Sequence, residues 1–199
     1  NCLEKGYELS DIQVLSPMYA GNAGITVLNQ ALQETFNPKT VDKNEVRLGY
    51  ITFREGDKIL QLKNQPDDEV SNGDIGTLIE IVDAKETEDK KTTIVVDFDG
   101  SFVEYKPDSF SNITLAYCIS VHKSQGSEYP IVIMPFAKNQ WIMLNKKLIY
   151  TAITRCKNTL ILIGNKEVFF QGCNVEERHQ RNTKLRQKIE IKSKKYSST

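Results

Sequence analysis

The sequence predicts an α/β protein in which a parallel-sheet domain is interrupted by a small antiparallel β-barrel. Toward both ends of the chain, short apolar runs alternate with segments of helical period, which is typical of a parallel sheet covered by helices. Between these regions, from about residue 45, the apolar period changes to two and turn residues come at short intervals. With 199 residues, 39% of them hydrophobic, the chain is long enough to bury such a core.

The chain opens as a strand, a loop and a helix. Residues 13–16 have the short apolar character of a buried strand, and the Gly/Pro-containing residues 17–24 form a loop after it. Apolar side chains then recur at intervals of three and four from Ile25 to Phe36, which predicts a helix. Asn37 and Pro38 end the pattern.

The middle of the chain is expected to be all-β. Alternating apolar residues predict strands at residues 50–53, 58–62, 75–82, 93–98 and 102–105. Residues 72–76 and 99–100 supply tight turns. These short strands without a helical pattern indicate a barrel of the SH3 or OB kind over residues 41–111. The acidic residues 67–69 follow Gln65-Pro66 in a polar segment, so we interpret them as a solvated loop and not as a magnesium site.

The strand-and-helix alternation returns in the last third. Residues 113–120 and 129–136 are expected as strands, residues 145–158 as a helix and residues 159–164 as a third strand. We therefore expect one discontinuous domain over residues 1–40 and 112–175. The remaining residues, 176–199, form a tail with eight Lys or Arg against three Glu, which is more simply a solvated, partly frayed helix than a phosphate-binding arm.

Composition narrows the possible cellular location of the protein and the kinds of site that it could contain. The four cysteines lack Cys-x-x-Cys spacing, so neither a zinc site nor a disulfide framework is indicated. No apolar run reaches the ~18 residues that cross a bilayer, and the first residues lack an export signal. We expect a cytoplasmic protein with no metal site and no membrane partner. The chain begins with Asn, which suggests that it was cut from a longer protein.

A polar cluster follows the strand expected at residues 113–120. Ligands bind at the carboxyl ends of parallel strands, so this cluster is placed to contact a ligand. Hydrogen-bonding side chains, phosphate-seeking cations and a glycine that allows close backbone approach make up the cluster: Ser124, Gln125, Glu128, His122, Lys123 and Gly126. The alternative is an ordinary surface turn, but the organisation of the cluster between two apolar runs favours the binding site.

Arg155 comes near the end of the helix expected at residues 145–158. A guanidinium at that place could direct its donors toward a phosphate in a neighbouring cleft. A lone arginine is more simply a surface residue at a helix C-terminus, so the hypothesis depends on the polar cluster nearby.

At these residues the sequence resembles a known family. Residues 122–128 and 150–157 are similar to the fifth and sixth motifs of superfamily 1 helicases, and the closer match is the RecD-like branch. Residues 14–38 resemble the fourth-motif region of that branch, and residues 56–66 and 72–76 resemble its inserted SH3-like module. The resemblance covers residues 11–164. It implies a RecA-like second motor domain, interrupted by an SH3-like barrel, of an ATP-dependent helicase that moves 5′ to 3′ on single-stranded DNA.

The resemblance also implies roles for individual residues. Arg155 is expected to be the arginine finger on the γ-phosphate of ATP. The nucleotide side of the cleft is expected to include Gln125, Gly126 and Glu128, with Gln125 linking this cleft to the DNA. The residues expected near DNA are His122, Lys123 and Ser124, together with Lys63 and Asn64 of the barrel.

No Gly-x-x-x-x-Gly-Lys-Ser/Thr loop is present to cradle the phosphates of ATP. We therefore expect an upstream motor domain of the same protein to bind most of the ATP and its Mg²⁺, and this chain alone to be inactive. Two alternatives remain open. One is a non-catalytic module that binds single-stranded nucleic acid, and the other is an RNA-directed translocase such as an Upf-type enzyme.

Overall fold

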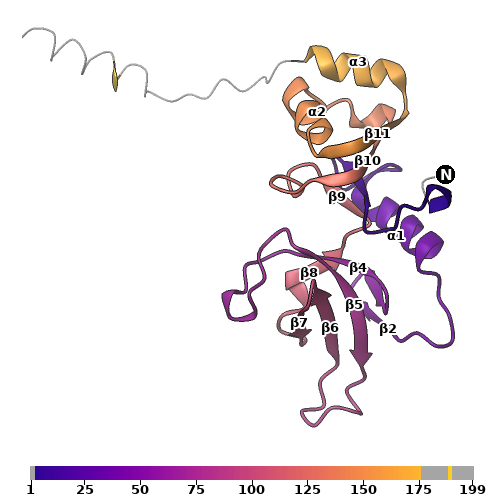
Figure 1. Ribbon diagram of the computed structural model, residues 1–199, viewed down its shortest axis with the longest axis vertical. Coiled ribbons are helices and arrows are strands. Elements are labelled where there is room, and N and C mark those ends of the chain that lie inside the picture. Colours follow the sequence, from indigo (N-terminus) through magenta and orange to yellow (C-terminus); the bar gives the residue numbers. More distant parts are fainter. Residues whose placement is uncertain (1–2, 176–187, 190–199) are drawn as a thin grey trace, which may run out of the picture.

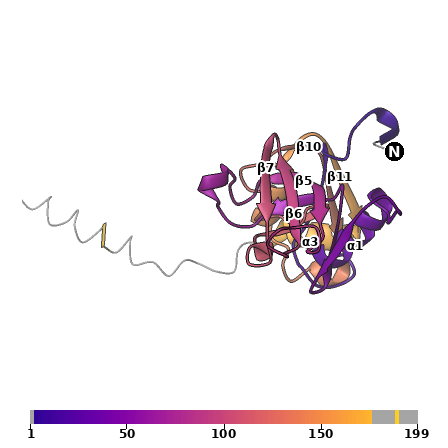
Figure 2. The same ribbon diagram turned by 90° about the horizontal axis from the view of Figure 1, so that it is seen from below.

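The computed structural model describes residues 3–175 and 188–189. A parallel sheet with helices forms one end of the molecule, and antiparallel strands form the other end (Figure 1). The first described residues lie on the same side of the molecule as the first long helix in both ribbon views (Figure 1 and Figure 2). The basic tail predicted for residues 176–199 lies outside the described residues except for Lys188 and Ile189.

The parallel sheet is built from segments at both ends of the described chain, as the alternation of strands and helices predicts. Its strands are β1 (Ile12–Ser16), β9 (Cys118–Ser120), β10 (Tyr129–Phe136) and β11 (Cys156–Gly164). Their order is β11-β10-β1-β9, and each neighbouring pair is parallel. A strand from the start of the chain therefore lies between two strands from its second half.

Helices cover the two faces of this sheet. They are α1 (Ile25–Phe36), α2 (Lys146–Ile153) and α3 (Lys166–Asn174). Ile25 of α1 packs with Val14 and Cys118 on one face. Leu148 and Ile149 of α2 join the core on the other face, which also contains side chains of β10. Helix α1 has the bounds that its apolar spacing predicts, whereas α3 was not anticipated.

Seven antiparallel strands form the inserted part. They are β2 (Glu45–Leu48), β3 (Ile51–Arg54), β4 (Lys58–Gln61), β5 (Ile75–Val82), β6 (Thr93–Phe98), β7 (Ser101–Tyr105) and β8 (Ile113–Leu115). Strands β2 and β3 pair with each other, and the other five form a sheet in the order β7-β6-β5-β4-β8. Among the described residues, hydrogen bonds therefore form two sheets and do not close a single barrel. Strand β2 was missing from the prediction.

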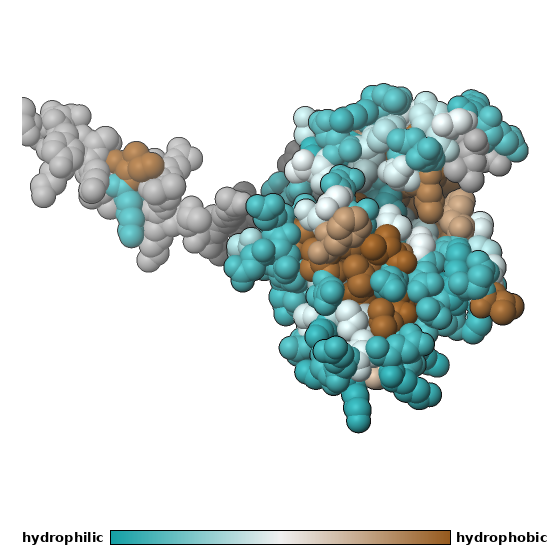
Figure 3. Space-filling view, turned by 60° about the horizontal axis from the view of Figure 1, so that its bottom comes forward, coloured by the Kyte–Doolittle hydropathy of each residue, from teal (hydrophilic) through white to brown (hydrophobic). Residues whose placement is uncertain are grey.

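Short 3₁₀ helices complete the elements: η1 (Leu3–Lys5), η2 (Pro66–Asp68), η3 (Phe110–Asn112) and η4 (Lys138–Gln140). No helix within the described residues is long and apolar enough to span a membrane. With the inserted part turned toward the viewer, the surface is mostly hydrophilic, and the largest group of hydrophobic residues lies near the centre, with smaller ones to its right (Figure 3).

The structure corrects two predicted boundaries. The run at residues 113–120 is two strands, because β8 pairs with β4 in the antiparallel sheet and β9 pairs with β1 in the parallel sheet. The helix expected to extend to residue 158 ends at Ile153, since the chain turns at Thr154 and enters β11 at Cys156. Arg155 therefore lies between α2 and β11, outside the helix.

A buried carboxylate joins the parallel-sheet part to the inserted part. Asp57 is 0% exposed, and burial raises the pKa of its carboxyl group against the opposing effect of its hydrogen bonds. Its Oδ2 accepts from Gln33 Nε2 at 2.6 Å and from the Arg54 backbone N–H at 2.7 Å. Its Oδ1 accepts from Asn37 Nδ2 at 2.7 Å and from the Tyr117 hydroxyl at 3.0 Å. We call these five residues the Asp57 cluster.

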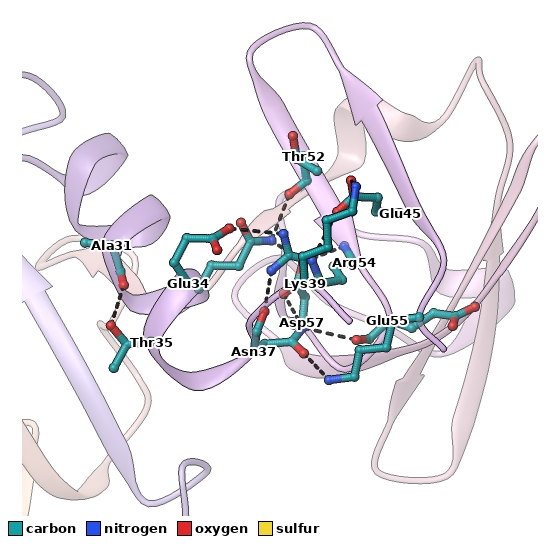
Figure 4. Close-up of polar contacts among 12 residues, drawn as sticks. Ala31, Glu34, Thr35, Asn37, Lys39, Glu45, Thr52, Arg54, Glu55 and Asp57 are labelled. Atoms are coloured by element: carbon teal, nitrogen blue, oxygen red, sulfur yellow. Dashed lines mark hydrogen bonds and ion pairs between the residues drawn. The ribbon is translucent and has the colours of Figure 1, made fainter. Parts of the chain in front are cut away.

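The buried Arg54 side chain adds contacts to the same junction (Figure 4). Its guanidinium donates to the backbone carbonyl of Asn37, to Glu34 at 3.0 Å and to Glu45 at 3.2 Å. Asn37 is where the chain leaves α1, and Tyr117 is where it returns to β9. The two chain segments that connect the parallel-sheet part to the inserted part are therefore both held at the Asp57 cluster.

Lys58 makes a further contact across the junction. It is 8% exposed, and its Nζ donates to the Ile12 carbonyl at 3.0 Å and the Leu9 carbonyl at 3.5 Å. Burial lowers the pKa of Lys58 to about 8, and nearby Asp11 only partly opposes the change. The unfolded chain, with an ordinary lysine pKa, therefore binds more protons than the folded chain above about pH 8.

This difference predicts a pH effect on stability. Because protons are released on folding in that range, the free energy of unfolding rises with pH. Between pH 7 and pH 10, we expect it to rise by about 2 kcal/mol more in the wild type than in Lys58→Met. Urea denaturation of both proteins at several pH values measures the difference. Parallel pH profiles for the two proteins would show that Lys58 keeps its ordinary pKa in the fold.

Candidate functional site

The predicted polar cluster forms a loop over residues 121–128, which we call the polar loop. It begins after Ser120, which lies level with Ser16 at the carboxyl ends of β9 and β1. It ends before Tyr129, which lies level with Cys156 at the amino ends of β10 and β11. The polar loop therefore runs from the carboxyl ends of the parallel strands to their amino ends. The cluster therefore follows the carboxyl end of a parallel strand, as predicted, and its last residues lead to the amino end of β10.

Internal contacts hold the polar loop in shape. Ser124 is 0% exposed, and its hydroxyl donates to the Val121 carbonyl at 2.8 Å. The backbone N–H of Lys123 donates to the Ser120 carbonyl at 3.0 Å. Gly126 has φ +93°, and a Cβ there would meet nothing within 4 Å, so the backbone conformation alone requires glycine. The Ser124 hydroxyl therefore makes its hydrogen bond within the polar loop.

The first half of the polar loop contacts the inserted part. Lys123 Nζ donates to Asn72 Oδ1 at 2.8 Å. The Asn72 backbone N–H in turn donates to Asn64 Oδ1 at 2.7 Å. Lys63 and Asn64 are exposed. The structure therefore brings together Lys123 and Asn64, two residues predicted near DNA, through a third residue that the prediction did not name as a site residue.

His122 and Gln125 line a cavity of about 230 Å³ between the polar loop and α2. The side chains that complete it are Val121, Met143, Asn145, Lys147, Leu148 and Thr151. Asn145 also caps α2, because its Oδ1 accepts from the Leu148 N–H at 2.8 Å. The polar loop and α2 thus line one cavity with both polar and apolar side chains.

The second half of the polar loop contacts Arg155. The guanidinium of Arg155 donates from Nη1 to the Ser127 carbonyl at 3.1 Å. It also donates from Nε to the Thr151 carbonyl at 3.3 Å and from Nη2 to Thr154 Oγ1 at 3.3 Å. The Arg155 carbonyl accepts from the Tyr129 N–H at 2.8 Å. Arg155 is therefore fixed both to the end of α2 and to the polar loop.

Glu128 lies in the same region. Its carboxylate is 3.5 Å from Lys157 Nζ, and both side chains are more than half exposed, so this ion pair contributes little to stability. Gln125 and Gly126 are exposed between the two contact regions. The polar loop therefore has Lys123 and the insertion at one end, and Glu128 and Arg155 at the other.

Within the described part of the chain, no three His, Cys, Asp or Glu side chains are grouped so that they could hold a metal ion. The acidic residues 67–69 are exposed in and after η2, which agrees with the predicted solvated loop.

The structure adds Asn72, Ser127 and Thr154 to the site. Asn72 was predicted as part of a turn and of the SH3-like module but not as a site residue, because a contact across 51 residues leaves no local signal in the sequence.

Two families match the chain. The family described as "ATP-dependent RecD-like DNA helicase SH3 domain" matches residues 28–98. The family described as "UvrD-like helicase C-terminal domain" matches residues 115–163, which include the polar loop and Arg155.

Curated relatives show the same relationship. The chain is 34% identical over 178 residues to the ATP-dependent RecD2 DNA helicase of Deinococcus radiodurans, a match that covers 89% of this chain and 23% of the relative. It is 29% identical over 163 residues to the RecD subunit of the RecBCD enzyme of Buchnera aphidicola, covering 79% of this chain and 25% of that subunit. The chain thus spans about a quarter of the length of these relatives.

Solved structures share the fold. A Bacteroides Pif1 helicase in complex with ADP-AlF3 and single-stranded DNA has a TM-score of 0.54 at 14% identity, covering 92% of this chain and 45% of that one. The Pif1 helicase of Candida albicans has a TM-score of 0.51 at 16% identity, covering 95% and 50%. At these identities the likeness is one of fold.

Proposed function

Because this chain belongs to the RecD-like branch of the superfamily 1 helicases, we propose that it forms the C-terminal motor domain of a longer cytoplasmic protein. That protein would couple ATP hydrolysis to 5′-to-3′ movement on single-stranded DNA and to duplex unwinding. The observation that carries the proposal is the polar loop, which contacts Arg155 at one end and the insertion, through Lys123, at the other.

On the nucleotide side, Arg155 is proposed to stabilise the negative charge that develops on the γ-phosphate during hydrolysis. Among the residues that the structure describes, each nitrogen of its guanidinium makes one hydrogen bond, which leaves a second N–H on both terminal nitrogens. Gln125, Gly126 and Glu128 would lie along the same cleft. An upstream motor domain would supply most of the ATP site and bind Mg²⁺, since the printed sequence has no phosphate-cradling Gly-Lys-Ser/Thr loop.

On the DNA side, Lys63, Asn64, His122 and Lys123 are proposed to contact the phosphate backbone. All four come from exposed or half-exposed positions on the polar loop and the insertion. Ser124 is proposed to act indirectly, because its hydroxyl holds the loop from inside. Contacts of this kind give affinity that falls with salt and depends little on sequence.

The proposal is tested by ATP hydrolysis of the full-length parent with and without single-stranded DNA. We expect strong stimulation by DNA, and no measurable hydrolysis by the 199-residue chain alone. Unwinding of duplexes that carry either a 5′ or a 3′ single-stranded tail then measures direction, and only the 5′-tailed duplex is expected to open.

Three outcomes would contradict parts of this proposal. Hydrolysis by the chain alone would show that it holds a complete ATP site. An ATP-indifferent parent that binds single strands would point to a non-catalytic binding module. Stimulation by RNA but not by DNA would identify an RNA translocase.

A further inference from the structure

Lys123 is held by an amide and not by a carboxylate. Its Nζ donates to Asn72 Oδ1 at 2.8 Å, and none of the ion pairs among the described residues includes Lys123. An amide oxygen orients an ammonium group without cancelling its charge. The ammonium has further N–H groups, so it can bind an anion while it keeps the contact with Asn72.

Hydrogen bonds within the insertion hold the turn that carries Asn72. The Asn72 N–H donates to Asn64 Oδ1 at 2.7 Å, and the Gly73 N–H donates to the Gln61 carbonyl at 2.9 Å. Gly73 has φ +108°, a conformation that favours glycine. The Asn72 amide is thus attached to strand β4 and to the exposed segment of Lys63 and Asn64, so it presents a rigid acceptor to Lys123.

We propose that Asn72 is a positioning residue that holds the Lys123 ammonium beside Lys63 and Asn64, so that the polar loop and the insertion bind the nucleic-acid backbone as one surface. This inference rests on the proposed function. Asn72 does not need to touch the phosphate. Its role is to keep the Lys123 side chain, which comes from a loop of the parallel-sheet part, beside Lys63 and Asn64 of the insertion.

The test measures the affinity of the full-length parent for fluorescein-labelled oligothymidylate at several salt concentrations. Lys123→Ala is expected to weaken binding about tenfold and to reduce the slope of log affinity against log salt by about 0.7. Asn72→Ala is expected to weaken binding about fivefold. The double variant is expected to match Lys123→Ala alone, because Asn72 acts only through Lys123.

Two further variants separate positioning from damage to the fold. Asn72→Asp is expected to weaken binding more than Asn72→Ala and to reduce the salt slope as Lys123→Ala does, because a carboxylate neutralises the ammonium. Asn174→Ala changes an exposed asparagine at the end of α3 and is expected to leave affinity unchanged. Thermal unfolding of each variant checks that the fold is retained.

The possible failures are distinct. If Lys123→Ala weakens binding while Asn72→Ala has no effect, or if the two effects add fully in the double variant, the inference about Asn72 is wrong and the proposed function stands. If Lys123→Ala binds as the wild type does, both the inference and the proposed DNA contact of Lys123 are wrong. If the parent binds no single-stranded DNA, the proposed function itself fails.

Discussion

Replacing Arg155 by alanine in the full-length parent is expected to lower DNA-stimulated ATP hydrolysis by about a thousandfold. The guanidinium is the charged group that the structure fixes between α2 and the polar loop, with one hydrogen bond from each of its nitrogens. An arginine in this role acts on the transition state, so ATP binding should change much less than the rate of hydrolysis. Steady-state hydrolysis and binding of a fluorescent ATP analogue measure the two quantities separately.

Two other variants make this result specific. Arg155→Lys keeps the positive charge but loses the planar fork, and it is expected to recover only a small part of the activity. Arg47→Ala removes an exposed arginine of β2 and should hydrolyse ATP as the wild type does. Equal loss of activity in Arg47→Ala and Arg155→Ala, or full activity in Arg155→Ala, would refute the assignment of Arg155.

The Asp57→Ala variant of this chain is expected to lose about 3 kcal/mol in the free energy of unfolding. The carboxylate accepts hydrogen bonds from Gln33, Asn37, the Arg54 backbone and Tyr117, so its removal leaves several buried donors without an acceptor. Asp57→Asn should also be destabilising, because its amide nitrogen would face one of these donors. Urea denaturation followed by circular dichroism measures the change.

Asp108→Ala is the matched control, since Asp108 is exposed in the inserted part. We expect its free energy of unfolding to differ from that of the wild type by less than about 0.5 kcal/mol. A similar small change in Asp57→Ala would mean that the Asp57 cluster contributes little and that the two parts are held together by apolar packing alone.

The spacing of apolar residues predicted most of the helices and strands that have a clear buried face. Helix α1 and strand β10 have the expected bounds because one face of the first and nearly every residue of the second are apolar. Strand β2 was missed although Glu45 to Leu48 alternate between polar and apolar residues, because so short a strand has only two apolar side chains. Helix α3 was missed for a different reason, since Phe170 is exposed and a glycine lies inside the helix.

The run at residues 113–120 shows a limit of a different kind. Its residues are almost all buried, so the sequence has one continuous apolar signal. The strand nevertheless changes sheets at Ala116 and Tyr117, because β8 finds its partner in β4 and β9 finds its partner in β1. Which strand pairs with which is decided by contacts across the fold, and these leave no mark in local spacing.

The candidate site could be predicted in part. The polar loop and Arg155 were recognised from motifs, and the structure brings the end of the loop to Arg155 through the Ser127 carbonyl. The burial of Ser124 and the contact of Lys123 with Asn72 were not predictable, because both depend on the path of the backbone and not on residue type. The catalytic and DNA-binding roles of these residues remain predictions.

The convergence of both connections at the Asp57 cluster has a consequence for folding rate. Strands β1 and β9 pair across about 100 residues, and closing so long a loop in an unfolded chain is slow. The hairpins β5–β6 and β6–β7 need only neighbouring segments to form. Once the inserted part has folded, Asn37 and Tyr117 meet at Asp57, and only short lengths of chain separate β1 from β9. The inserted part would thus act as an internal template whose early folding sets the rate at which the parallel sheet assembles.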